Sequence, residues 1–148
     1  MPATAQLPPR EPGEGERFRV DLATDLSRVG DVVETVCTGC FRQAPVSRRT
    51  QFRLRTVLAE ALANAMLYGN GGDPSRHVIV DVELHDELIV IAVSDEGDGF
   101  NYNAVPLPIW DESLESTRGR GLFMIHRLAD DVAFNDRGNT IWMTLPRH

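Results

Sequence analysis

An acidic residue and an amide lie four positions apart in the segment Glu60-Ala-Leu-Ala-Asn64. On a helix, this spacing places both side chains on the same side, one turn apart. The Asn64 amide oxygen is a hard ligand suited to Mg²⁺, and the Glu60 carboxylate can orient or deprotonate a nucleophile beside a metal-bound phosphate. Alanines surround the pair and would allow a ligand to approach closely. A solvated polar helix face has the same spacing, so the pair alone does not decide its role.

A second candidate is the turn Asp95-Glu96-Gly97-Asp98-Gly99, which directly follows an apolar run. A carboxylate at the end of a strand can accept hydrogen bonds from an exocyclic amine such as that of adenine. Gly97 and Gly99 allow the backbone to turn sharply and to approach a planar base. An ordinary Asp/Gly turn has a similar composition.

A third candidate is Gly119-Arg120-Gly121, which the apolar pattern places immediately before a helix. Amide groups and the positive end of a helix together form a natural cradle for phosphate, and Arg118 and Arg120 add positive charge. A flexible hinge is the alternative interpretation of a lone Gly-x-Gly. The three candidates together favour a nucleotide site far more than any one of them alone.

The elements that must position these residues follow from the apolar periodicity and from the Gly and Pro signals. We expect a strand at 18–22, a helix at 25–37 that Gly39 ends, and a long helix that opens at Pro45 and Ser47 and ends at Gly69. A hairpin of 78–84 and 88–93, a helix at 119–130, and a hairpin of 132–135 and 140–145 follow. This order predicts an α/β (α+β) two-layer sandwich, with helices on one face of a mainly antiparallel sheet.

The 148 residues predict one domain, at 17–148, after a disordered N-terminal tail at 1–16. The tail is rich in Pro, Gly and Glu and has too few large apolar side chains to offset the entropy of ordering. The stretch from 101 to about 118 has little periodicity. A loop of this length in a small domain is usually functional or mobile.

Charge and cysteine content limit the functional classes. A net charge of −7 argues against a broad nucleic-acid footprint, although arginines cluster at 48, 49, 53 and 55 and could serve an anion or an acidic partner. No apolar run approaches the roughly 20 residues that cross a bilayer, and the first residues lack a secretory signal, so we expect a cytoplasmic protein without direct nucleic-acid or membrane contact. Cys37 and Cys40 match a redox or half-zinc spacing, but two ordinary reduced cysteines explain them better.

The three segments, in this order, resemble the N, G1 and G2 boxes of the GHKL ATPase superfamily. Within it, the chain is similar to bacterial anti-sigma factor serine kinases of the RsbW and SpoIIAB type. The quoted segments are Glu60-Ala-Leu-Ala-Asn64, Asp95-Glu-Gly97-Asp-Gly99 and Gly119-Arg-Gly121-Leu-Phe-Met-Ile, and the similarity runs from about Phe18 to Leu145.

The resemblance implies a Bergerat-type fold that binds ATP and Mg²⁺. Glu60 would be the general base, Asn64 the Mg²⁺ ligand and Asp95 the partner of adenine, with Gly97 and Gly99 beside it. Residues 101–118 would form the ATP lid. The remaining nucleotide-binding residues that the resemblance implies are Arg118, Gly119, Arg120, Gly121 and Leu122 around the phosphates, and Thr140 in support of the adenine pocket.

The resemblance also implies a function. Such a kinase phosphorylates a serine on a small anti-anti-sigma (STAS) partner, otherwise sequesters an RNA polymerase sigma factor, and forms a homodimer. Tyr68 stands where family members commonly carry His. A nucleotide-binding switch that transfers no phosphoryl group is therefore an alternative, and the ATP domain of a sensor kinase is a third, although the sequence has no dimerisation helix with a phosphoacceptor His.

Overall fold

The computed structural model describes residues 16–43, 46–99 and 117–147, and the elements there follow the predicted order. The strands are β1 (Glu16–Ala23), β2 (His77–Leu84), β3 (Leu88–Asp95), β4 (Asp131–Phe134) and β5 (Thr140–Pro146). The helices are α1 (Val29–Gln43), α2 (Arg48–Asn64) and α3 (Thr117–Leu128). A 3₁₀ turn, η1 (Leu26–Arg28), precedes α1, and a π-helical turn, η2 (Ala65–Gly69), continues α2. The tail predicted at 1–16, apart from Glu16, and most of the lid predicted at 101–118 lie outside the described residues.

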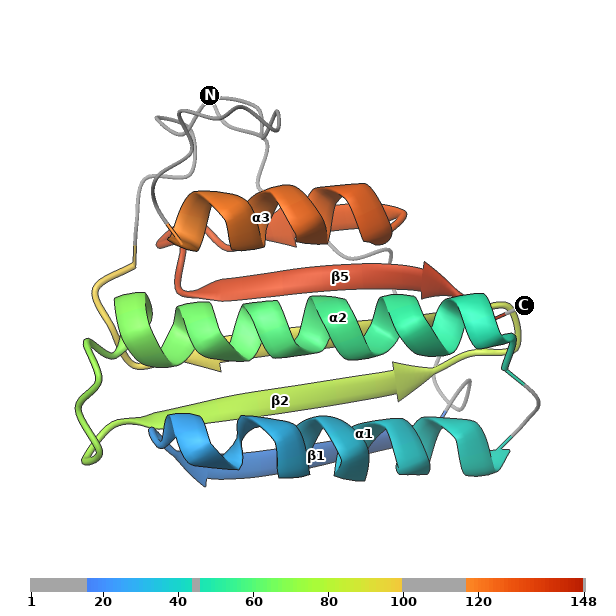
Figure 1. The fold of residues 1–148 in the computed structure, drawn as a ribbon, viewed down its shortest axis with the longest axis horizontal. Coiled ribbons are helices and arrows are strands. Elements are labelled where there is room, and N and C mark those ends of the chain that lie inside the picture. The colour runs from blue at the N-terminus through green and yellow to red at the C-terminus, as the bar shows by residue number, and fades with distance from the viewer. Residues whose placement is uncertain (1–15, 44–45, 100–116, 148) are drawn as a thin grey trace.

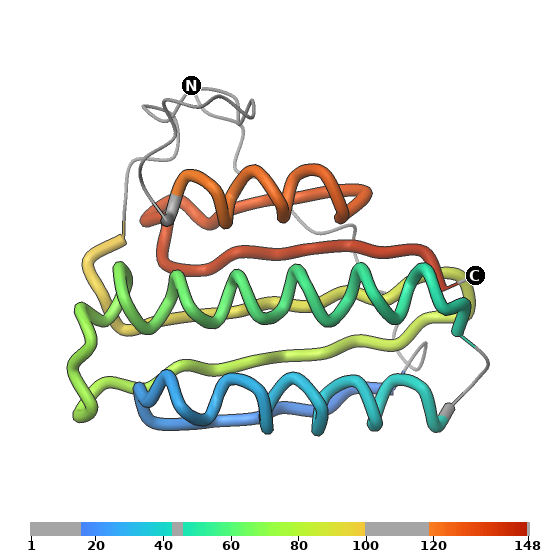
Figure 2. The backbone as a smooth tube through the Cα atoms, viewed as in Figure 1, coloured from blue at the N-terminus to red at the C-terminus, as the bar shows by residue number. Residues whose placement is uncertain are grey.

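The strands form one sheet in the order β1-β2-β3-β5-β4, and every pairing among them is antiparallel. Helices α1, α2 and α3 lie side by side across one face of this sheet (Figure 1). The backbone trace in Figure 2 shows β2, β3 and β5 passing behind the helices. The predicted two-layer sandwich with helices on one face is confirmed.

The core lies between the two layers, because alternate residues of each strand point toward the helices. On β2 every second residue from Val78 to Leu84 is buried, and on β5 Ile141, Met143 and Leu145 are buried in the same way. Their partners on α2 are fully buried and include Leu54, Leu58 and Leu62. The helix begins at a cap, since the Ser47 side chain accepts a hydrogen bond from the Thr50 amide.

Two predicted boundaries were wrong. Helix α1 does not end at Gly39 but continues to Gln43. A Cβ on residue 39 would lie 3.0 Å from the Phe18 ring, so this glycine provides room for β1 against the helix rather than a helix stop. Helix α3 begins at Thr117, so Gly119 and Gly121 lie inside its first turns and not before it. Packing of α3 against α2 outweighs the low helix propensity of glycine there.

Candidate nucleotide-binding site

The candidate site lies where the C-terminal end of α2 meets the end of β3. Asn64 is the last α-helical residue, and the backbone then widens into the π turn, in which the Asn70 amide donates to the Ala65 carbonyl at 2.8 Å. Such π turns are rare and often mark functional positions. Glu60 and Asn64 are each partly buried on α2, as their spacing predicts.

Gly121 brings α3 against this pair. A Cβ at position 121 would lie 2.8 Å from Glu60 Oε2 and 3.2 Å from Asn64 Nδ2. The absence of a side chain therefore allows α3 to approach the carboxylate and the amide closely. Gly119 and Arg120 belong to the first turn of α3, where the positive end of the helix dipole lies. The segment predicted to form a phosphate cradle thus lies within the start of α3, and the side chain of Arg118 is outside the described residues.

Asp95 is held at the end of β3 by its own turn. Its Oδ1 accepts a hydrogen bond from the Gly97 amide at 2.8 Å. The residue beside it on the helix is Gly69, where any Cβ would collide with the Asp95 carboxylate. Likewise, a Cβ on Gly97 would collide with the Gly69 carbonyl oxygen. The two glycines allow the strand end and the helix end to touch, so Asp95 points toward α2.

The β4–β5 turn packs against the end of β3 through the following contacts. The Asn139 carbonyl accepts from the Asp95 amide at 2.9 Å, and Thr140 Oγ1 donates to Ser94 Oγ at 2.9 Å. Gly99 has φ of 85°, and a Cβ there would collide with the Arg137 carbonyl. A left-handed glycine is therefore required where the turn after β3 packs against this hairpin.

These elements surround a cavity that is open to solvent on one side. Of the predicted binding residues, Asn64, Asp95, Gly99, Leu122 and Thr140 line it. Glu60, Gly97 and Gly121 do not line it, but each adjoins Asn64 or Asp95 through the contacts given above. The remaining lining residues are Ala61, Ala65, Tyr68, Gly69, Val93, Ile125, Phe134, Gly138, Asn139 and Ile141.

Most of those further lining residues were missed from the sequence. Ala61 and Ala65 are exceptions, since they belong to the alanines that the sequence marks as allowing close approach of a ligand, and Gly69 continues their spacing of four residues. Val93, Ile125 and Ile141 carry no such signal, because an apolar side chain that lines a pocket has the same periodicity as one in the core. Gly138 and Asn139 could have been found as the turn that precedes Thr140.

The residues present fit a purine nucleotide. A mostly apolar cavity that is lined by the Asp95 carboxylate suits an adenine ring, since the exocyclic amine of adenine donates hydrogen bonds. The Asn64 amide, beside the Glu60 carboxylate, supplies oxygen donors of the kind that Mg²⁺ takes together with substrate phosphates. The positive end of α3 lies across from them and suits the phosphates.

The two cysteines lie away from this site, on α1, with both side chains fully buried in the core. Burial raises the pKa of the Cys37 thiol to about 11 and that of the Cys40 thiol to about 12. Both groups are therefore neutral thiols near neutral pH, and the thiolate is the form that attacks disulfides or binds metal. They act as small apolar core residues.

Comparison with known proteins agrees with this geometry. The model of the histidine kinase-like ATPase domain matches residues 20–145, which is most of the chain and includes all three motif segments. The chain belongs to the histidine kinase-like ATPase family, the group that the three motifs resemble.

Among individual proteins, the chain is similar to anti-sigma F factors. It is 28% identical to that of Geobacillus thermodenitrificans over 95 residues, which cover 61% of this chain and 65% of the relative. It is 30% identical to that of Bacillus cytotoxicus over 96 residues, 62% of this chain and 66% of the relative. The matches thus span just under two thirds of these relatives. In the part of the chain that the structure describes, no helix has the length and apolar character needed to span a membrane.

Proposed function

We propose that this chain is an ATP-dependent protein serine kinase and anti-sigma factor. It phosphorylates a STAS-domain anti-anti-sigma partner and otherwise sequesters a sigma factor, and so regulates transcription in the cytoplasm as a homodimer. The observation that supports nucleotide binding is the cavity that Asn64, Asp95 and Thr140 line together. The similarity to proteins named anti-sigma F factor supports the choice of partners.

The assigned roles follow from the chemistry of each group. Asp95 accepts from the adenine amine, and Asn64 holds Mg²⁺. Bound ATP with Mg²⁺ would supply the phosphoryl group and the charge that neutralises it. Gly119, Arg120, Gly121 and Leu122, together with Arg118, surround the phosphates at the positive end of α3. In such transfers positioning and electrostatics provide most of the acceleration.

Glu60 is the proposed general base. It lies one turn before Asn64 on α2, and Gly121 allows the start of α3, where we place the phosphates, to lie close to its Oε2. A carboxylate next to the metal ligand can orient that hydroxyl and accept its proton as the phosphoryl group is transferred.

A nucleotide-dependent switch without transfer is the second candidate. Tyr68 favours it, because this residue lines the cavity and the family resemblance leads us to expect His at this position. In the switch, nucleotide binding would select the partner and Glu60 would have no chemical role.

Incubation with γ-labelled ATP, Mg²⁺ and a cognate STAS protein separates the two. The kinase predicts label on the STAS serine with wild type, and a loss of at least about a hundredfold in rate with Glu60→Gln, the lower end of what a general base typically contributes. Glu87→Gln is the matched control, since Glu87 is exposed in the turn before β3, at the opposite end of that strand from Asp95. Wild type that binds ATP but transfers no label would support the switch, and full activity of Glu60→Gln would exclude Glu60 as the base.

A further inference from the structure

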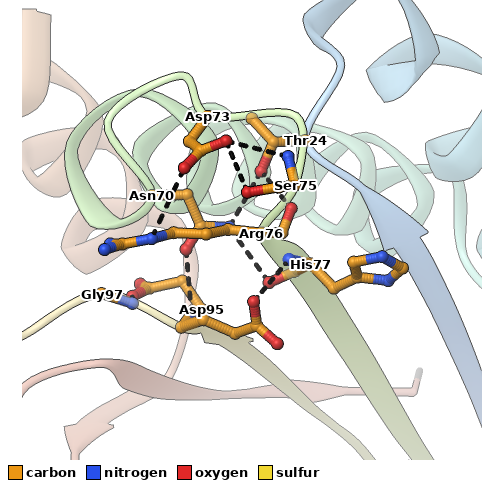
Figure 3. Close-up of polar contacts among 9 residues, drawn as sticks. Thr24, Asn70, Asp73, Ser75, Arg76, His77, Asp95 and Gly97 are labelled. Carbon is orange, nitrogen blue, oxygen red and sulfur yellow. Dashed lines mark hydrogen bonds and ion pairs between the residues drawn. The ribbon is translucent and has the colours of Figure 1, made fainter.

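A polar network lies next to the Asp95 turn and connects Glu96 of that turn to residues outside the three motif segments. Its centre is Asn70, the residue after the π turn, which is only 2% exposed. Figure 3 shows Asn70 between the Thr24 and Arg76 region on one side and Asp95 with Gly97 on the other. A buried amide is costly unless its donors and acceptor are paired, so the partners of this side chain indicate what it does.

Asn70 uses both ends of its amide. Its Nδ2 donates to Thr24 Oγ1 at 2.9 Å and to the His77 carbonyl at 3.0 Å. Its Oδ1 accepts from the Glu96 amide at 2.9 Å. Two contacts therefore anchor the side chain to the ends of β1 and β2, and the third reaches forward into the turn after β3.

The Thr24 side of the network is itself fixed. Thr24 is buried, its amide donates to the Arg76 carbonyl at 3.0 Å, and its Oγ1 donates to the same carbonyl at 2.8 Å. Because Thr24 is held by two hydrogen bonds to the backbone, its own hydrogen bond to Asn70 restricts the Asn70 side chain to one orientation. On the other side of the turn, the Glu96 carboxylate accepts from the His77 amide at 3.0 Å.

The hydrogen bond from the Glu96 amide to Asn70 Oδ1 fixes the backbone next to Asp95. The Glu96 amide belongs to the peptide unit that joins Asp95 to Glu96, so holding it fixes the rotation of the backbone just after Asp95. The Asp95 amide is held on the other side by the Asn139 carbonyl. With the backbone fixed at both sides and Oδ1 held by the Gly97 amide, the carboxylate has a defined direction.

We propose that Asn70 is a positioning residue for purine recognition. By holding the Glu96 peptide, it orients the Asp95 carboxylate toward an exocyclic 6-amino group and so sets the preference for adenine over a 6-oxo purine. This inference rests on the proposed binding of ATP at Asp95. In this proposal Asn70 does not contact the nucleotide. Its effect is on the selectivity between bases and not on the affinity for the phosphate groups.

The experiment compares the dissociation constants of the full chain for ATP and for inosine triphosphate, both with Mg²⁺. Inosine carries oxygen where adenine carries the amine, so its oxygen faces the Asp95 carboxylate. Asn70→Ala is expected to reduce the preference for ATP by about tenfold, the usual scale for one misdirected hydrogen bond to a charged group, with little change in affinity for inosine triphosphate. Asn70→Ser, too short to reach Glu96, is the second variant if the alanine form does not fold.

Two controls separate positioning from general stability. Asn70→Asp retains an oxygen for the Glu96 amide but loses both donors, so it should melt at a lower temperature and yet keep most of the preference. Thr50→Val removes another buried hydroxyl, which donates to the Pro146 carbonyl at 3.0 Å, at the far end of α2. It should lower the melting temperature and leave the ratio of the two constants unchanged.

The outcomes are distinct. The measured ratio is the dissociation constant for inosine triphosphate divided by that for ATP. A lower ratio for Asn70→Ala or Asn70→Ser, together with an unchanged ratio for Thr50→Val, supports the inference. Equal weakening of both nucleotides, or an unchanged ratio, would overturn it while leaving the proposed nucleotide site intact. Wild type that binds neither nucleotide would overturn the proposed function itself, and the inference with it.

Discussion

The two halves of helix α2 face the same sheet but differ in what they present to it. The first half packs large side chains such as Leu54 and Leu58, both fully buried, and is tied down by polar contacts to the other elements. Thr50 Oγ1 donates to the Pro146 carbonyl, and Arg53 Nε donates to the Leu128 carbonyl at 2.6 Å. This half fills the space between the layers.

The second half of α2, with the π turn that continues it, presents Ala61, Ala65 and Gly69 and leaves the cavity open. Its polar groups, Glu60 and Asn64, are beside the glycine of α3 rather than in the core. One helix therefore contributes to the core along its whole length, and only its second half also borders the cavity. In that second half, Leu62 and Met66 are fully buried in the core, while the small residues line the cavity.

Removal of bulk from the first half is expected to have the largest effect on stability. Leu58→Ala leaves a cavity in the core and should lower the free energy of unfolding by about 2–5 kcal/mol. Urea denaturation followed by circular dichroism measures this value. Phe52→Ala is the control on the same half, because Phe52 is 60% exposed, and its change should be within about 0.5 kcal/mol. Similar losses for the two variants would refute the role assigned to this half.

Added bulk in the second half should act on binding instead. Ala61→Leu places a branched side chain into the cavity and should weaken ATP binding by about a hundredfold, or ~2.7 kcal/mol. Isothermal titration with Mg²⁺ measures this constant. Ala63→Leu is the matched control, since Ala63 is on the same stretch of α2 but does not line the cavity. If Ala61→Leu bound ATP as wild type does, the cavity would not be the nucleotide site.

The sequence was informative to different degrees about the two halves. The fold followed from periodicity, because the alternation on β2 and the apolar face of α2 are set by burial on one side. Glu60, Asn64, Asp95 and the glycines could be proposed as site residues because polar and glycine residues stand out in such patterns. The apolar wall of the site could not be found, since Val93 and Ile125 pack as core residues do. The start of α3 was also misplaced, because the contact of Gly121 with α2 is a tertiary interaction that no local signal records.

The smallest expected effect concerns two exposed pairs that join β1 to β2. The Asp21 carboxylate, with Oδ1 at 2.6 Å from His77 Nδ1, raises the pKa of His77 above its ordinary 6.5. A raised pKa means that the protonated form favours the folded state, so this contribution is fully present below pH 6.5 and is lost as the pH rises through the folded-state pKa. This pair therefore stabilises the folded protein slightly more at acidic pH than at alkaline pH.

Melting temperatures of wild type and Asp21→Asn at about pH 5.5 and about pH 8.5 test this component. Wild type should melt at a higher temperature than the variant at the lower pH, and the difference between the two melting temperatures should shrink at the higher pH. Asp81→Asn is the control, because Asp81 pairs with Arg19 at 2.7 Å and arginine does not titrate in this range. A gap for Asp21→Asn that is equal at both pH values would contradict the assigned cause.

The most direct test of the central claim is the affinity of the full chain for ATP with Mg²⁺, measured by isothermal titration on wild type and Asp95→Asn. The asparagine oxygen can still accept from the Gly97 amide, so the turn should persist, while a carboxylate oxygen that would face the adenine amine is replaced by an amide donor. Wild type should bind one ATP per chain, and Asp95→Asn should bind about a hundredfold more weakly with a similar melting temperature. Equal affinity of the two proteins, or no binding by wild type at millimolar ATP, would contradict the nucleotide site described for this cavity.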